Sequence, residues 1–218
     1  MHEASTLETG TSPRGTESRE QIFACALRLF ARQGFDRTGM RELAREAGVN
    51  LAMVNYFFGS KQNLLREILD TFFSAYIAIA RRELHSATTP QLRLRRFIRA
   101  AIAHFAEHQD HLIIAITDLH HDDEELSSYK ARWAEQMLHL LEQQVCAPLR
   151  QNGKADISAK TLSPLLTSMM ASRFLFAPVI QRADNASVVP DIDAYSDMIA
   201  TVAVYGINAF TASAQEPL

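Results

Sequence analysis

Apolar residues recur at helical spacing along nearly the whole chain, and this periodicity constrains the fold more than any other feature. The first helix is predicted from about Ser18 to Gly34, with one apolar face formed by Ile22, Cys25, Ala26, Leu29 and Phe30. No segment alternates as a strand would, and the remaining helices are predicted at 40–47, 50–57, 61–85, 91–107, 110–119, 124–151, 159–181 and 191–213. The 8 Gly and 7 Pro leave few turns for a many-stranded sheet. We therefore predict an all-α fold of nine helices.

The distribution of charge divides the chain into two predicted domains. Residues 1–16 are rich in Ser, Thr and Gly without apolar periodicity, which predicts a disordered tail. Residues 14–66 contain nine Lys and Arg against five acidic residues, whereas residues 67–218 have a net charge of −5. We expect a basic domain at 17–62 and a larger helical domain at 63–218, with the basic end facing a polyanion.

Several classes of protein are disfavoured by what the sequence lacks. The two cysteines are far apart and have no partners at metal-ligand spacing, which argues against a disulfide framework or a zinc site and fits a reducing cytoplasm. No run approaches the roughly 18 apolar residues of a membrane span, and the N-terminus does not resemble a signal peptide. The sequence has no G-x-S-x-G, P-loop or G-x-G-x-x-G motif, so we expect no catalytic residues, no cofactor and no enzymatic activity.

The stretch TGMRELAREAGVNLAMVNYFFGSK, residues 38–61, has the layout of a helix-turn-helix. Gly48 lies at the turn, where a residue free to adopt positive φ is needed. Ala44 is small where the two helices approach each other, and Val49 and Val54 are apolar, as needed to seat the second helix on the first. By spacing alone, a small helical bundle with glycines at these positions is an equally good interpretation.

The second of these helices is predicted to expose Asn50, Leu51, Ala52, Met53 and Asn55. An Asn side chain presents a donor and an acceptor to a base edge, and an apolar side chain can contact a thymine methyl group. Lys61 follows at the start of the next helix, where it and the N-terminal amides are placed to bind a phosphate. The segment is therefore a candidate DNA-binding surface.

Residues 19–65 resemble the N-terminal DNA-binding domain of TetR-family (tetracycline-repressor-like) transcriptional regulators. The resemblance runs through Ile22, Ala26, Leu29, Phe30, Gly34, Phe35, Thr38, Leu43, Ala44, Ala47, Gly48, Val49, Tyr56, Phe58, Lys61 and Leu64. The string GVNLAMVNYFFGSK looks most like the branch that reads roughly GVNxAxxNYHFGSK. The resemblance implies DNA contacts from Thr38, Arg41, Asn50, Leu51, Ala52, Met53, Asn55, Tyr56 and Lys61.

Two positions depart from the pattern of the family. Phe57 stands where many relatives have a His that contacts a phosphate, and Gly39 stands where a Ser or Thr often caps the second helix. Thr38 is a candidate for that cap instead. Because each lost phosphate contact removes part of the salt-dependent affinity, we expect somewhat weaker non-specific binding.

The family resemblance also implies a homodimeric repressor that binds a palindromic operator in double-stranded DNA. Two recognition helices must then lie about one DNA turn, roughly 34–36 Å, apart. The last two helices are suited to the dimer because each has a broad apolar stripe, one in 159–181 and one in 191–213, where it includes Ala203 and Gly206. Ordinary packing within one monomer explains the same stripes.

The family's larger domain holds a pocket for a small-molecule inducer, and the sequence offers lining residues for one. Aromatic and Met side chains gather on the middle helices, and the ligand-binding candidates are Phe72, Phe73, Tyr76, Phe105, Trp133, Met137, Met170, Arg173 and Phe174. Such residues predict a largely apolar ligand, although any one of them is more often core. Arg173 suits an anionic ligand head, a partner carboxylate or a position facing solvent equally well.

The histidines are the remaining candidates for metal ligands. His104 and His108 share a helix face, His111 follows, and His120 and His121 precede two aspartates. Without an H-E-x-x-H motif or a nearby Cys, we interpret them as surface or hydrogen-bonded histidines and predict no metal site.

Two function classes follow from these residues. The first is a ligand-responsive transcriptional repressor. The second is a helical small-molecule-binding protein or enzyme whose N-terminal helices are only a scaffold. The exposed Asn-rich helix at 50–57 and the Lys that follows it favour the first.

Overall fold

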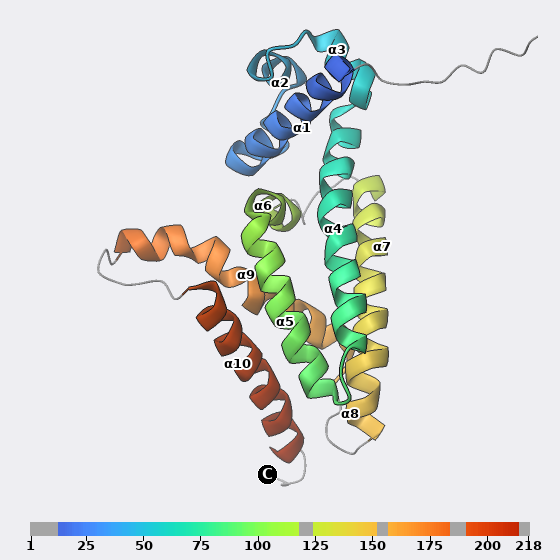
Figure 1. The fold of residues 1–218 in the computed structure, drawn as a ribbon, viewed down its shortest axis with the longest axis vertical. Coiled ribbons are helices and arrows are strands. Elements are labelled where there is room, and N and C mark those ends of the chain that lie inside the picture. The colour runs from blue at the N-terminus through green and yellow to red at the C-terminus, as the bar shows by residue number, and fades with distance from the viewer. Residues whose placement is uncertain (1–12, 118–123, 152–156, 184–190, 214–218) are drawn as a thin grey trace, which may run out of the picture. The chain divides into compact units, whose positions relative to one another are not determined.

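The fold was analysed in a computed structural model that describes residues 13–117, 124–151, 157–183 and 191–213. These residues form helices and connecting turns without strands, so the predicted all-α class is confirmed (Figure 1). The elements are α1 (Pro13–Gln33), α2 (Met40–Glu46), α3 (Leu51–Phe58), α4 (Lys61–His85), α5 (Pro90–Glu107), α6 (Gln109–Thr117), α7 (Glu124–Leu141), η2 (Glu142–Cys146), α8 (Ala147–Gln151), α9 (Ala159–Ala183) and α10 (Ile192–Ser213).

These bounds agree with the predicted helices except at a few points. The predicted helix 124–151 is continuous, but its residues Glu142–Cys146 form a π-helical turn between α7 and α8. Helix α1 begins at Pro13, so the prediction that residues 13–16 belong to the tail was wrong. A proline is favourable in the first turn of a helix because it has no N–H to leave unpaired. The rest of the predicted tail lies outside the described residues.

The chain forms two compact units, Met1–Leu69 and Asp70–Leu218, which we call the N-terminal and C-terminal units. The division falls inside α4, later than the boundary predicted after residue 62. The reason is that Leu64, Leu65 and Ile68, in the first two turns of α4, are fully buried with the N-terminal core. The first part of α4 is therefore a structural element of the N-terminal unit.

The core of the N-terminal unit is formed where α1, α2 and α3 pack on one another. The side chains at its centre are almost fully buried: Ile22, Ala26, Phe30, Leu43 and Val54. The chain turns after α1 at Gly34, whose φ is +88°, a value that a side chain would strain. The apolar face predicted for the first helix is thus the face that packs.

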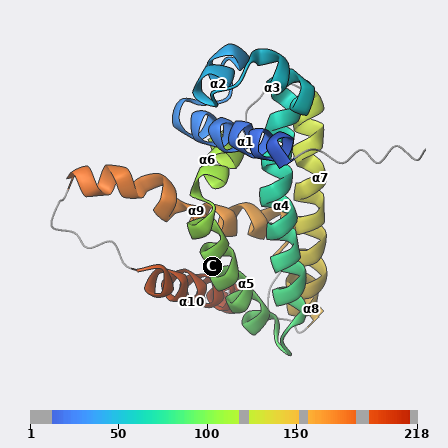
Figure 2. The same cartoon turned by 45° about the horizontal axis from the view of Figure 1, so that its top comes forward.

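In the C-terminal unit, α5 is the central helix. It packs along α10 and against α9, and the Arg99–Asp197 ion pair at 2.8 Å adds a polar link between α5 and α10. Both views draw the part of α4 after Asp70 alongside α7 (Figures 1 and 2). The Tyr129 hydroxyl donates a hydrogen bond to the Asp70 carboxylate, and this bond ties the two helices together.

Helix α9 is the one described helix that is long and apolar enough to cross a membrane by length and composition alone. It contains two prolines, Pro164 and Pro178, and it packs against α5, α6, α7 and α10. A helix of a protein core passes the same test, but only 22% of the most apolar stretch of α9 is buried, and Leu165, Phe176, Val179 and Ile180 are exposed.

Candidate nucleic-acid interface and effector cavity

The segment 40–58 forms the helix-turn-helix that the sequence predicts. Gly48 has φ +67° at the turn, and the Val49 N–H donates to the Ala44 carbonyl at 3.0 Å, which closes the turn. Ala44 and Val54 are buried between α2 and α3. These contacts fix which face of α3 points away from the unit.

The outward face of α3 contains most of the residues predicted to contact DNA. Ala52, Asn55 and Tyr56 are exposed, and Tyr56 has 79% of its surface accessible. Leu51 and Met53 are half-buried at the same helix's first turn. These side chains lie on the face of a helix-turn-helix that is not used in its packing, and this face is accordingly a candidate contact surface.

Asn50 has a structural role that the sequence analysis missed. It is the N-cap of α3, and its side-chain oxygen accepts a hydrogen bond from the Met53 N–H at 2.8 Å. The cap satisfies one of the N–H groups that begin a helix without a partner. The capping bond therefore holds the Asn50 side chain against the start of α3, whereas the Asn55 side chain has no such partner among the described residues.

Lys61 also has partners inside the N-terminal unit. Its Nζ donates to the carbonyls of Phe35 at 2.9 Å and Thr38 at 3.1 Å, and it lies 4.2 Å from the centre of the Phe35 ring. A third carbonyl, that of Asp36, is 3.5 Å away. Lys61 thus holds the α1–α2 turn, and its predicted role as a phosphate ligand stays a prediction.

Thr38 and Arg41 lie at the start of α2 in different environments. Thr38 is 1% exposed, and its hydroxyl donates to the Gly34 carbonyl and accepts from the Gln33 side chain. It does not cap α2, because Gly39 is the N-cap and makes no side-chain bond. Arg41 is exposed, and its predicted role as a DNA contact stays a prediction.

At the position where relatives have a His, Phe57 is half-buried and packs edge-to-face on Tyr56, with ring centres 5.1 Å apart. A phenyl ring has no hydrogen-bonding atom for a phosphate. Its contact instead restrains the exposed ring of Tyr56.

Most of the predicted ligand-binding residues form the core of the C-terminal unit. Phe72 and Phe105 are almost fully buried and stack at 5.8 Å, and Tyr76 packs on Phe105 at 5.3 Å. Burial raises the pKa of the Tyr76 hydroxyl far above its usual range. Met137 and Met170 are buried as well. These five residues are placed as core residues, and their role in binding a ligand stays a prediction.

Two other members of the predicted set form a separate pair. Phe73 and Trp133 are half-buried, and their rings stack at 5.9 Å where α4 meets α7. The pair anchors α7 to α4 within the C-terminal unit.

Arg173 and Phe174 line a cavity of about 540 Å³ beside α5 and α9. The other lining residues are Ala106, Gln109, Ala177, Pro178, Gln181 and Ile192. Pro178 cannot donate a helical hydrogen bond, so the Phe174 carbonyl is without its usual helical donor at the cavity wall. Arg173 also lies 5.7 Å from the centre of the Tyr195 ring, beside a smaller cavity of about 280 Å³. Both volumes suit small ligands.

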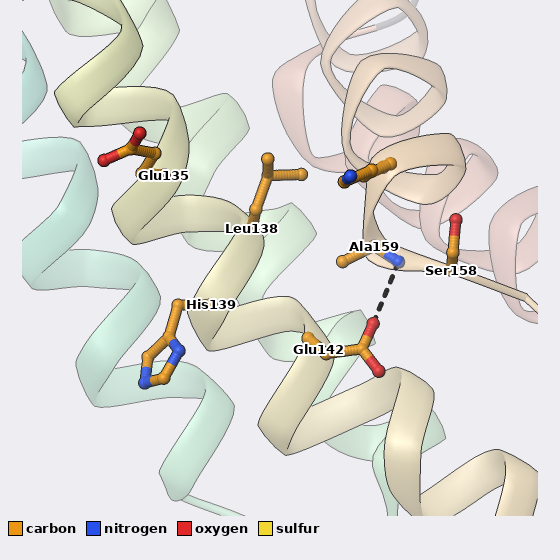
Figure 3. Close-up of a pocket in the computed structure, with 7 residues that line it drawn as sticks. Glu135, Leu138, His139, Glu142, Ser158 and Ala159 are labelled. Atoms are coloured by element: carbon orange, nitrogen blue, oxygen red, sulfur yellow. Dashed lines mark hydrogen bonds between the residues drawn. The ribbon is translucent and has the colours of Figure 1, made fainter.

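A third cavity, of about 420 Å³, lies between α7 and the start of α9 (Figure 3). Glu142 accepts a hydrogen bond from the Ala159 N–H at 3.2 Å and pairs with Arg150. The hydrogen bond from Arg150 holds the pKa of the Glu142 carboxyl below its usual range. Glu135 and His139 line the same cavity. Sequence reasoning missed it because its residues come from two different helices, with Glu142 and Ala159 17 residues apart in the chain.

The histidines of α5 and α6 are packed together rather than spread over the surface. His104 and His111 are buried, and the rings of His104 and His108 lie 4.5 Å apart. Desolvation lowers the pKa of His111 to about 4, and it lowers the pKa of His104 as well. Among the residues that the structure describes, no group of three His, Cys, Asp or Glu could hold a metal ion. His120 and His121 lie outside those residues.

The exposed large apolar side chains concentrate on the last two helices. Among the described residues, Leu165, Phe176, Val179 and Ile180 of α9 and Met198, Val202 and Tyr205 of α10 are each about half exposed or more. Ala203, in contrast, is buried within the unit, and a side chain added at Gly206 would meet open space.

Comparison with known proteins supports a DNA-binding domain at the site just described. Residues 22–68 match the family model of bacterial regulatory proteins of the tetR family. The probable HTH-type transcriptional regulator YttP of Bacillus subtilis is 34% identical over 59 residues, which are 27% of this chain and 28% of YttP. The HTH-type transcriptional regulator HbdR of Aromatoleum sp. is 30% identical over 99 residues, 45% of this chain and 43% of HbdR. The matched region spans less than half the length of each of these curated relatives.

The fold as a whole resembles solved regulators. FadR from Bacillus subtilis, solved in complex with stearoyl-CoA, aligns with a TM-score of 0.67 at 17% identity, over 86% of this chain and 98% of FadR. This likeness shows a shared helical fold. The sequence signature of the tetR family therefore lies in the N-terminal unit, at residues 22–68, and the likeness to FadR adds the helical fold alone.

Proposed function

We propose that the chain is a DNA-binding transcriptional regulator that acts as a homodimeric repressor at a palindromic operator. The observation that carries the proposal is the helix-turn-helix with an outward face on α3, in the segment that matches the tetR family model. Within that family we place the chain in the branch that reads roughly GVNxAxxNYHFGSK, with Phe57 in place of the His. A cytoplasmic location follows from the proposed activity.

The dimer is proposed to form through α9 and α10. Large exposed apolar side chains concentrate on these two helices, and contiguous exposed apolar surface is typical of a protein–protein interface. An HTH dimer must also present two recognition helices at a fixed spacing. Val202 and Tyr205 are exposed and next to each other on α10 by helical spacing. A second copy of the chain is the partner that satisfies both requirements.

The proposed effector is a largely apolar small molecule that binds in the C-terminal unit. The cavity of about 540 Å³ lined by Arg173 and Phe174 supports this, because it is of ligand size and has one cationic side chain. A long-chain acyl-CoA is the first probe to test, since the structurally similar FadR was solved with stearoyl-CoA. Release of DNA then requires that the effector and the operator weaken each other's binding by the same factor.

The proposal is tested by selecting genomic DNA fragments bound by the full chain and measuring their affinity by fluorescence anisotropy. We expect enriched fragments to share an inverted repeat, and Arg41→Ala to weaken binding about equally for all sequences. Binding without any enriched sequence would contradict a role as an operator-specific regulator.

The dimer is tested separately by sedimentation of Val202→Arg. This exposed substitution is expected to split the dimer, because each copy of a twofold interface buries the same charge. Leu92→Arg, at an exposed apolar residue of α5, is the matched control and should stay dimeric. If Val202→Arg remained a dimer, the dimer interface could not include Val202.

A further inference from the structure

We propose that α3 reads A·T base pairs, recognising an adenine through Asn55 and thymine methyl groups through Leu51 and Ala52. The inference rests on the proposed function, since it assumes that α3 enters the major groove. It goes further by assigning the base composition of the half-site that this chain selects.

The first argument is the set of side chains on α3, which has the sequence LAMVNYFF. In the major groove, guanine is typically read by Arg or Lys and cytosine by Glu or Asp. None of these residues occurs in Leu51–Phe58. The helix therefore has apolar groups, one amide and one phenol with which to recognise bases.

The second argument is the difference between the two asparagines at this site. The side-chain oxygen of Asn50 is occupied by the Met53 N–H at 2.8 Å. Asn55 is exposed one turn later, and among the described residues its side-chain amide has no hydrogen-bond partner. An Asn with both amide atoms available pairs with the N6 and N7 atoms of adenine. Asn55 is thus the adenine reader.

The third argument is the position of the apolar side chains relative to Asn55. Leu51 and Ala52 precede it by four and three residues, so they lie on the same face of the helix. The first residues of a recognition helix are the ones that approach base edges. Apolar side chains there bury the C5 methyl group that distinguishes thymine from the other bases.

The inference is confined to the base pairs that α3 faces. Arg41 and Arg45 lie on α2, outside α3, and Arg45 pairs with Glu46 at 3.3 Å. Tyr56 presents a single hydroxyl, which suits a phosphate oxygen better than a two-bond contact with a base.

The experiment begins with selection of bound duplexes from a random pool by the full chain. We expect enriched half-sites whose central positions are A·T. In the selected duplex, each contacted thymine is then replaced by deoxyuracil, which removes the methyl group and keeps all hydrogen-bonding atoms. An affinity loss of about fourfold is expected at each contacted thymine, from about 0.8 kcal/mol for one buried methyl-sized group.

A second substitution isolates Asn55. Replacing the contacted adenine by 7-deazaadenine removes the N7 acceptor and should weaken binding by about fivefold or more. Asn55 is exposed, and the folding of Asn55→Ala is checked by circular dichroism. The DNA affinity of this variant should not change when the adenine is replaced by 7-deazaadenine. Gln21→Ala, exposed on α1, is the matched control and should keep the full sensitivity of the wild type.

The outcomes separate this inference from the proposed function. Enriched half-sites with G·C at the positions facing α3, or affinities unchanged by both modified bases, would overturn the A·T assignment while leaving the regulator intact. If no sequence is enriched at all, both the proposed function and this inference are wrong.

Discussion

In the N-terminal unit, helix periodicity places core and candidate function on opposite faces of one helix. Val54 of α3 is fully buried, whereas Asn55 and Tyr56 beside it are exposed. In the C-terminal unit, the same aromatic residues serve as candidates for both roles. Phe72 and Phe105 were predicted to line a pocket, and the structure stacks them in the core. A functional face can be predicted from sequence where its side chains differ chemically from those of a core. A pocket lined by core-like residues cannot be predicted in this way.

The largest expected effect comes from treating Phe72 as a core residue. Phe72→Ala should lower the free energy of unfolding of the C-terminal unit by about 3–5 kcal/mol, because the ring is 2% exposed and packed on all sides. Phe174→Ala, at the wall of the 540 Å³ cavity, should cost less than about 2 kcal/mol. Urea unfolding followed by the fluorescence of Trp133, the chain's single tryptophan, measures both. Equal losses of unfolding free energy in the two variants would contradict the distinction between core and cavity residues.

Acidification should destabilise the C-terminal unit through its buried histidines. The pKa of His111 is about 4 in the fold, against 6.5 in an unfolded chain, and that of His104 is also lowered. The unfolded state therefore takes up protons first, so stability is full above about pH 6.5 and falls as the pH drops toward 4. The expected slope is about 1.4 kcal/mol per pH unit for each histidine.

The titratable groups around the His104 and His111 rings also shift their pKa values. His108 lies next to both and lowers their pKa values further, while Glu107 raises that of His104. His111→Leu should reduce the slope of stability against pH, whatever it does to stability at pH 7.5. A His111→Leu slope equal to that of the wild type would show that this ring does not titrate on unfolding.

Substitutions of Lys61 and Arg41 should distinguish a cation that stabilises the fold from a cation that binds phosphate. Lys61→Ala removes two good hydrogen bonds to the α1–α2 turn and should lower both DNA affinity and the stability of the N-terminal unit, the latter by about 1.5 kcal/mol. Its slope of log affinity against log salt should not change. Arg41→Ala should reduce that slope by about one unit. A reduced salt slope for Lys61→Ala would instead show that Lys61 contacts a phosphate, as the sequence predicts.

The smallest expected effect is that of the α3 cap. Asn50→Ala should destabilise α3 by about 1 kcal/mol and weaken binding to all duplexes alike, because the cap orders the helix without reading a base. Asn50→Ser keeps a capping oxygen and should restore most of the affinity. Loss of preference at one particular base pair in Asn50→Ala would instead mark Asn50 as a base reader.

The sequence was sufficient for the order of the helices and for the helix-turn-helix, because these depend on local periodicity and on glycines such as Gly48 with positive φ. The roles of Asn50 and Lys61 were not evident from it. Asn50 is both a good cap and a good base reader by residue type, and Lys61 reaches carbonyls more than twenty residues away in sequence. Only the fold shows which partner each side chain has found.

The cavities were harder to predict for a related reason. The wall residues Glu142 and Ala159 are joined by a hydrogen bond although they are 17 residues apart, and no periodic pattern in the sequence indicates such a contact. Arg173 stood out in the sequence because a charge in an apolar stretch breaks the pattern, and it does line a cavity. Phe174, which follows the apolar pattern, lines the same cavity, but its residue type alone did not distinguish it from the core aromatic residues.

The central claim is that α3 of the N-terminal unit gives the chain its sequence preference for DNA. The most direct measurement is the ratio of affinities for the selected operator and for a scrambled duplex, taken for the wild type and for Asn55→Ala at one salt concentration. The account predicts that Asn55→Ala lowers this ratio by about 5- to 150-fold while its affinity for the scrambled duplex stays the same. An unchanged ratio would contradict the account and place the reading of sequence outside α3.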